Sequence, residues 1–180
     1  LAGTVDALGP GVVAPALGAR VAVFTGQGGL AEVGCFDAAR CTVLPDAMSF
    51  EHAAAFPIAY GTGHLALTHR ARLAPRETLL VLGAAGGIGL AAVEVGKRMG
   101  ARVIAVARGA ERLSVAAKAG ADHLVDSEAG DLQTIVRALG GAEVVFDAVG
   151  GAYAQKALGA TNPGGRYLVI GFASGQVPEF

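Results

Sequence analysis

The sequence has few of the features that mark several large classes of protein. Two cysteines, Cys35 and Cys41, are too few for a disulfide framework. Fourteen lysines and arginines nearly balance fifteen aspartates and glutamates, and neither sign gathers in a block, which argues against nucleic acid or an anionic membrane as the main partner. No uncharged apolar run reaches the roughly 18 residues of a membrane-spanning helix, so none is predicted.

Histidine and cysteine are also too sparse for a zinc site. Zinc takes four ligands at characteristic spacings, and the four histidines show no paired spacing with the two cysteines. His64 and His69 stand five residues apart, a separation that turns them to different faces of an α-helix. We therefore expect no bound metal, thiols and histidines that serve packing or the surface, and a cytoplasmic location.

Apolar residues and glycine are abundant, and their arrangement is most regular between Leu79 and Ala107. The apolar run Leu79–Leu82 enters a cluster of glycines. A helical pattern follows from Leu90 and is stopped by Gly100, and Val103–Val106 has the pattern of a second buried strand. Strand, glycine turn, helix and strand form a βαβ unit of about 30 residues, the size that a dinucleotide-binding crossover needs.

The glycines of this turn have separate expected roles. Gly83 and Gly86 allow a tight bend and let backbone N–H groups approach a pyrophosphate, while Gly89 lets the helix pack closely on the strand. The strict G-x-G-x-x-G pattern is not met, because Ala84 holds its first position. A glycine turn with a purely structural purpose is the alternative.

Downstream of this unit, helix and strand patterns continue to alternate. Five parallel strands in a doubly wound α/β sheet are predicted, with ligands at the carboxyl ends of the strands. The expected helices are Glu111–Ala119, Asp131–Leu139 and Tyr153–Leu158, and the expected strands are His123–Val125, Glu143–Phe146 and Arg166–Ile170, the last preceded by a turn at Asn162–Gly165.

Residues 1–47 have β-rich patterns instead. Arg20–Phe24 and Ala31–Phe36 flank Gln27–Gly29, which predicts a hairpin with a glycine turn. Cys41–Leu44 is expected to form a short strand stopped by Pro45. We interpret this part as the remaining half of a small barrel-like domain.

Two helical patterns connect the two regions. Ser49 is expected to cap a helix from Glu51 to Phe56, and Pro57 to end it. Tyr60–Arg70 then has a second helical pattern.

The end of the second predicted strand favours NADPH over NADH. NADH calls for a carboxylate there to bind the ribose hydroxyls, and no acid follows Val106 before Glu111. Arg108 and Arg112 are placed to meet a 2′-phosphate through charge-assisted hydrogen bonds. The alternative is that both arginines are merely solvated at the start of a helix.

Together these segments resemble the medium-chain dehydrogenase/reductase superfamily, and most closely its zinc-independent quinone oxidoreductases, the zeta-crystallin-like enzymes. The resemblance implies a partial GroES-like catalytic domain at residues 1–56 and an NADP-binding Rossmann domain at 57–180, incomplete at its C-terminal end. It also implies NADPH-dependent reduction of quinones or α,β-unsaturated carbonyls. The motifs that carry it are Gly3–Val5, Pro45-Asp46, Ala53–Pro57, Tyr60–Thr62, Leu79–Gly89, Gly120–Asp122, Phe146–Gly150 and Gly164–Arg166.

The family's cofactor contacts carry over to named positions. Ala84–Gly89 matches the pyrophosphate loop, Arg112 a basic residue for the 2′-phosphate, and Gly171–Ser174 a loop that passes the cofactor. Ser127 stands where family members often place a tyrosine on the adenosine phosphate. The expected cofactor-binding residues are Gly83, Ala85, Gly86, Gly87, Ile88, Gly89, Arg108, Arg112, Ser127, Val149, Gly171, Phe172 and Ser174.

Residues for the chemistry itself are fewer. Thr62 matches a threonine beside the nicotinamide in the family, and Tyr60 is a candidate to orient or protonate a substrate oxygen, although an aromatic residue there also suits a core. Asp147 is expected to be structural or to lie near a ribose. The family's first strands would precede Leu1 and its last strand would follow Phe180, so we expect a piece of a longer protein, homodimeric at full length.

Three other classes of protein have features in common with this sequence. A trans-enoyl thioester reductase of the polyketide-synthase kind shares this loop, and some relatives are non-catalytic NADPH-binding structural or regulatory proteins. A short-chain dehydrogenase is rejected, because Tyr153-Ala-Gln-Lys156 is one residue short of the Tyr-x-x-x-Lys that it needs. The first two remain beside the quinone reductase.

Overall fold

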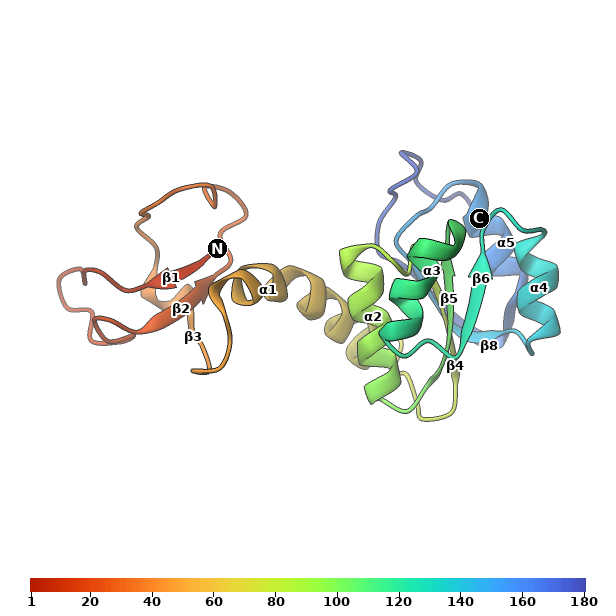
Figure 1. The fold of residues 1–180 in the computed structure, drawn as a ribbon, viewed down its shortest axis with the longest axis horizontal. Coiled ribbons are helices and arrows are strands. Elements are labelled where there is room, and N and C mark those ends of the chain that lie inside the picture. Colours follow the sequence, from red (N-terminus) through yellow and green to blue (C-terminus); the bar gives the residue numbers. More distant parts are fainter. The chain divides into compact units, whose positions relative to one another are not determined.

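A computed structural model describes residues 1–180 and divides the chain into two compact units, Leu1–Gly61 and Thr62–Phe180. Figure 1 shows the order of their helices and strands along the chain. No helix is long and apolar enough to cross a lipid bilayer.

The first unit contains a small antiparallel sheet. Its three strands, β1 (Ala2–Thr4), β2 (Arg20–Val23) and β3 (Cys41–Val43), lie in the order β1-β2-β3. Ala22, Leu44 and Ala53 form its buried cluster, and Ala53 comes from helix α1 (Phe50–His64). The predicted strand that Pro45 stops is thereby confirmed.

The predicted hairpin between Arg20–Phe24 and Ala31–Phe36 is wrong. Both edges of β2 are already paired, to β1 on one side and β3 on the other, so no edge remains for a further strand. Residues 31–36 lie outside the sheet, and Val33 is 79% exposed. Sequence alternation alone did not show which neighbour β2 would take.

The predicted end of a helix at Pro57 is also wrong, because α1 continues through Pro57 to His64. The start was predicted correctly: Ser49 Oγ accepts a hydrogen bond from the His52 N–H at 3.3 Å. A π-helical segment, Leu65–Arg70, follows directly. Its wider turn brings residues five apart together, so the rings of His64 and His69 meet edge to face at 6.3 Å between centroids, contrary to the expectation of different faces.

The second unit is the predicted doubly wound parallel sheet. Its strand order, β6-β5-β4-β7-β8, reverses direction at β4, from which the chain first winds one way and then the other. The strands are β4 (Thr78–Leu82), β5 (Arg102–Ala107), β6 (His123–Asp126), β7 (Ala142–Asp147) and β8 (Thr161–Val169), and the helices are α2 (Gly87–Arg98), α3 (Gly109–Lys118), α4 (Leu132–Ala138) and α5 (Ala152–Gly159).

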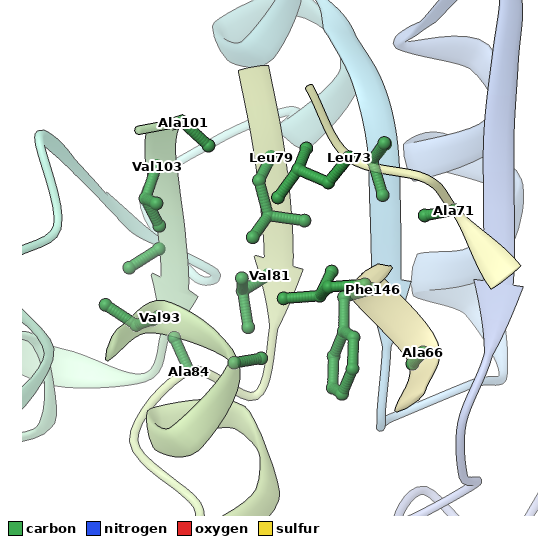
Figure 2. Close-up of a cluster of buried hydrophobic side chains, with 14 of the residues drawn as sticks. Ala66, Ala71, Leu73, Leu79, Val81, Ala84, Val93, Ala101, Val103 and Phe146 are labelled. Carbon is green, nitrogen blue, oxygen red and sulfur yellow. The ribbon is translucent and has the colours of Figure 1, made fainter. Parts of the chain in front are cut away.

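Alternate residues of the buried strands face two separate cores. Leu79 and Val81 pack with Val93 of α2 and Ala116 of α3, whereas Leu80 and its neighbour Leu82 pack against α4 and α5. Figure 2 shows the first of these clusters, with the side chains of Leu79 and Val81 on one face of β4 beside Val103 and Phe146. A strand that is covered on both faces explains the continuous apolar runs of the sequence.

The turn predicted at Asn162–Gly165 lies within strand β8 and forms a bulge there. Thr161 pairs with Ala142 and Arg166 with Val144, so four residues of β8 bulge out opposite a single residue of β7. Gly164 has a φ of +76° within this bulge. The strand therefore starts earlier than expected, at Thr161.

Candidate functional site

A cavity of about 740 Å³ lies at the carboxyl ends of the strands in the second unit. Its walls come from the ends of β4 and β5 and from the segments that follow β6 and β7, which is the place where the strand order reverses. Both the position and the size are those of ligand sites in open α/β sheets. Bound groups there would meet the starts of the helices.

The floor of the cavity is the turn from Gly83 to Gly89, which joins β4 to α2. Gly83 has a φ of +71°, a backbone conformation that residues with a side chain rarely adopt. The Gly86 N–H closes the bend on the Gly83 carbonyl at 2.9 Å, and the Ala84 N–H donates to Val106 O at 3.0 Å. The first bond closes the turn on itself, and the second ties it to β5.

Four backbone N–H groups of this turn have no acceptor within the chain. They belong to Ala85, Gly87, Ile88 and Gly89, and the last three form the uncapped first turn of α2. The N-cap residue is Gly86, so no side chain satisfies them. A helix start with free N–H groups and a positive end of the helix dipole is a binding site for an anion such as a phosphate.

The close approach of α2 to the turn depends on Gly89. A Cβ at this buried position would overlap the Gly83 carbonyl oxygen and would lie 2.8 Å from its carbon. At Gly87, in contrast, a Cβ would meet nothing within 4 Å, because that position opens on the cavity. One glycine is thus required by packing within the protein, and the other leaves room for a ligand.

A second wall follows β7 and is held by Asp147. This carboxylate is fully buried, and its Oδ1 accepts hydrogen bonds from the N–H groups of Val149 and Gly150, both at 2.8 Å. Its Oδ2 accepts from the Tyr167 hydroxyl at 2.7 Å. Asp147 therefore has a structural role as expected: it shapes the loop that carries Val149 into the cavity wall.

Burial and the contact with Asp147 both change the pKa of the Tyr167 phenol. Burial, followed by its hydrogen bond to Asp147 and the charge of that carboxylate, raises the pKa of Tyr167 above its ordinary value. The phenol consequently stays protonated and remains a donor to the carboxylate across the neutral pH range. The buried charge of Asp147 has three donors around it, which is what a buried carboxylate requires.

The segment after β8 lies across the same loop. The Ala173 N–H donates to Ala148 O at 3.2 Å and the Ser174 N–H to Val149 O at 2.9 Å. Gly150, with a φ of +68°, would carry a Cβ only 3.3 Å from the Phe172 Cβ. Ala173 and Ser174 are thereby brought to the cavity, and Phe172 is left 55% exposed.

The rim beyond β5 carries the only charged side chains that line the cavity, Arg108 and Arg112. Arg108 is the N-cap residue of α3, and Arg112 lies one helical turn further on. Arg108 Nε forms an ion pair at 3.2 Å with Oε1 of Glu128, and both side chains are more than 60% exposed. The rim is therefore positively charged, and one of its two arginines already has a partner.

Most of the residues predicted to bind a cofactor line this cavity together. Those that do are Gly83, Ala85, Gly86, Gly87, Ile88, Gly89, Arg108, Arg112, Ser127, Val149 and Ser174. Gly171 and Phe172 do not line it. Ala107, Ala148 and Ala173 also line it and lie in segments expected at the carboxyl ends of the strands, whereas the sequence patterns missed Leu82, Val106 and Tyr153, two residues at strand ends and one in α5.

Neither of the two residues expected at the chemistry is among the residues that line the cavity. Thr62 belongs to α1 and is not among the lining residues. Tyr60 belongs to the first unit, where its ring stacks on Phe56 at 4.6 Å between centroids. No three histidine, cysteine, aspartate or glutamate side chains gather in an arrangement for a metal ion, and both cysteines are free thiols.

These features fit a dinucleotide. Free N–H groups at a glycine turn suit a pyrophosphate, the arginine rim suits a further phosphate, and the cavity volume lies within the range of cofactor sites. Sheet and site together define a Rossmann-type domain, in the class of doubly wound nucleotide-binding folds.

Comparisons with known proteins give the family. The profile described as zinc-binding dehydrogenase matches residues 87–180, which is more than half of the chain. The chain is 40% identical over 164 residues to quinone oxidoreductase-like protein 2 of Bos taurus, covering 89% of this chain and 47% of that protein. It is 35% identical over 179 residues to the polyketide synthase GfsB of Streptomyces halstedii, covering 99% of this chain and 3% of that protein.

Among solved structures, the quinone oxidoreductase of Escherichia coli complexed with NADPH superposes with a TM-score of 0.91 at 30% identity, covering 99% of this chain and 56% of that one. The chain therefore belongs to the zinc-binding dehydrogenase family of the medium-chain dehydrogenase/reductase superfamily, a family of oxidoreductases, and falls in its quinone oxidoreductase branch. It spans about half the length of the curated relatives that it matches.

Proposed function

We propose that this chain is the NADPH-binding part of a zinc-independent oxidoreductase that transfers hydride to a quinone or an α,β-unsaturated carbonyl compound. The observation that carries the proposal is the Gly83–Gly89 turn, whose free N–H groups face a cavity with an arginine rim. The E. coli relative, which superposes over nearly the whole chain, is a complex with NADPH. The cofactor supplies the hydride, and the protein supplies its position and surroundings.

The chain's own residues would hold the cofactor at three places. The N–H groups of Gly87, Ile88 and Gly89 would bind the pyrophosphate, and Arg108 and Arg112 would bind the 2′-phosphate. The turn after Asp147 and the segment at Ser174 would border the rest of the nucleotide. Tyr60 and Thr62 remain our candidates for contacts at the substrate and the nicotinamide.

A second candidate is a trans-enoyl thioester reductase. It is favoured by the similarity to a polyketide synthase along 99% of this chain. Both enzymes would use the same cofactor site, so they differ only in the electrophile that receives the hydride. A third candidate, a non-catalytic NADPH-binding protein, would retain the cavity and lack turnover.

One set of measurements separates these candidates. NADPH binding is measured first by titration, and NADPH oxidation by the complete protein is then followed with quinones, simple enones and trans-enoyl thioesters. Oxidation with quinones or enones supports the main proposal, and oxidation restricted to thioesters supports the second candidate. Binding without oxidation of any substrate supports the third, and absence of NADPH binding would overturn all three. Homodimer formation and a cytoplasmic location remain predictions.

A further inference from the structure

Glu128 is an acidic residue placed directly against the positively charged rim. Its carboxylate pairs with Arg108 at 3.2 Å, and Glu128 itself does not line the cavity. Arg112, the other rim arginine, forms no ion pair. The rim is thus divided into one free guanidinium and one that a carboxylate already occupies.

The pairing follows from the sheet and its turns. Ala107 at the end of β5 lies opposite Asp126 at the end of β6, so the residues after both strands emerge side by side. Asp126 Oδ1 then accepts from the Gly109 N–H at 3.3 Å and from the Glu128 N–H at 3.1 Å. One carboxylate therefore holds both turns, and this arrangement keeps Glu128 within reach of Arg108.

Such a carboxylate acts differently on the two nicotinamide cofactors. A dianionic 2′-phosphate that approaches Arg108 must displace Glu128 or lie beside its charge, and either lowers the affinity. A 2′-hydroxyl carries no charge, and a carboxylate is the group that accepts hydrogen bonds from it in NAD-binding sites. The same ion pair therefore works against NADPH and not against NADH.

We propose that Glu128, acting through Arg108, sets the cofactor preference and keeps the discrimination between NADPH and NADH well below what two free arginines would give. This inference rests on the proposed function. The chain then accepts both cofactors, with NADPH favoured mainly through Arg112. Glu128 is a specificity-determining residue, and the chemistry that it selects is the presence or absence of a phosphate on the adenosine ribose.

The test compares dissociation constants of NADPH and NADH for the wild type and for Glu128→Gln. The substitution keeps the shape of the side chain and removes its charge, and both partners are exposed, so the fold is expected to persist. NADPH should bind about three- to tenfold more tightly, and NADH should bind equally or slightly more weakly. Adenosine 2′,5′-bisphosphate against 5′-AMP should show the same change, which locates the effect at the ribose phosphate.

Glu111→Gln is the matched control. Glu111 lies in the first turn of α3, between the two rim arginines, and loses the same charge without lining the cavity. The ratio of NADPH affinity to NADH affinity in Glu111→Gln should stay within about twofold of the wild-type ratio. The gain in Glu128→Gln should also shrink at high salt, because the pair is exposed.

The outcomes distinguish this inference from the proposed function. An unchanged NADPH/NADH ratio in Glu128→Gln, or an equal change in Glu111→Gln, would overturn the role of Glu128 and leave NADPH binding standing. Failure of the wild type to bind any of the four nucleotides would overturn the proposed function and this inference with it.

Discussion

The two ends of the cavity are built from different materials. At the Gly83–Gly89 turn the ligand-facing groups are backbone N–H groups, held by the fold itself and next to the buried Gly89. At the rim they are the side chains of Arg108 and Arg112, and Arg108 is exposed and paired with a carboxylate. Substitutions that move the backbone of the turn should therefore change nucleotide affinity strongly, whereas substitutions of the exposed rim side chains should change it in small steps.

Gly89→Ala should have the largest effect on stability and nucleotide affinity, because it disrupts the Gly83–Gly89 turn, the end of the cavity that is built from backbone. The added Cβ would overlap the Gly83 carbonyl, so the turn or α2 must shift. We expect the free energy of unfolding to fall by about 1–3 kcal/mol, as overpacking does. NADPH affinity should fall about 100-fold, since losing two hydrogen bonds to a charged phosphate at roughly 1.5 kcal/mol each costs about 3 kcal/mol. Thermal unfolding and nucleotide titration measure the two effects.

Gly87→Ala is the matched control for this prediction. Its Cβ would point into open space, so stability should be unchanged or should rise by up to about 1 kcal/mol. Nucleotide affinity should still drop, because the methyl group would point into the cavity where the pyrophosphate is proposed to bind. If Gly89→Ala were as stable as the wild type and bound NADPH as tightly, the proposed binding of the cofactor at the Gly83–Gly89 turn would be contradicted.

The double change Arg108→Ala with Arg112→Ala tests the other end. Loss of both guanidinium groups should weaken NADPH about 30-fold, roughly 2 kcal/mol of charge-assisted contact that Arg112 mainly supplies, and NADH by less than about threefold. Stability should be little changed, because Arg108 is a surface side chain and its ion pair with Glu128 is exposed. An equal loss for NADPH and NADH would remove the 2′-phosphate assignment.

Much of the backbone-built end was readable from the sequence. Short apolar runs between glycines predicted β4, α2 and β5, because strands buried on both faces must be apolar along their length. The ion pair between Arg108 and Glu128 was not predicted, since it depends on the register of β5 against β6, which local patterns do not contain. Strand pairing of Ala31–Phe36 failed for the same reason.

Some lining residues carried no signal at all. Tyr153 had the pattern of an ordinary helical residue, and only the loop held by Asp147 brings it to the cavity. Pro57 was a strong local signal that the surrounding helix overrides. Backbone conformation that glycine dictates was therefore predictable, while contacts between side chains in segments that follow different strands were not.

Asp147→Asn is expected to have an intermediate effect, because it alters a buried side chain that supports backbone. An amide nitrogen would face donors in place of one carboxylate oxygen, which leaves the N–H groups of Val149 and Gly150 or the Tyr167 hydroxyl without an acceptor. The free energy of unfolding should fall by about 1–3 kcal/mol, and NADPH affinity by up to about tenfold. Denaturant unfolding and nucleotide titration report both.

Tyr167→Phe removes the hydroxyl that donates to Asp147, and it also tests how the free energy of unfolding depends on pH. The pKa of Tyr167 is raised in the folded protein, first by burial and then by Asp147, so the folded state holds its proton where an unfolded chain begins to lose it. This contribution is complete below about pH 10 and declines as the pH rises above that value. Tyr167→Phe should therefore flatten the alkaline fall of stability, and an unchanged alkaline slope would contradict the arrangement.

The smallest expected effect is a gain at the exposed rim. Ser127 lines the cavity directly after β6, and its N–H donates to Ala107 O at 3.1 Å, which leaves the side chain free to vary. In Ser127→Tyr the hydroxyl would gain reach toward the phosphate that Arg112 is proposed to bind, and NADPH should bind about threefold more tightly through one added hydrogen bond. Ser127→Phe supplies the ring without the hydroxyl. A gain in Ser127→Phe as large as in Ser127→Tyr would mean that ring contact, and not recognition of the phosphate, accounts for the affinity, and the rim would then be less selective than its charge indicates.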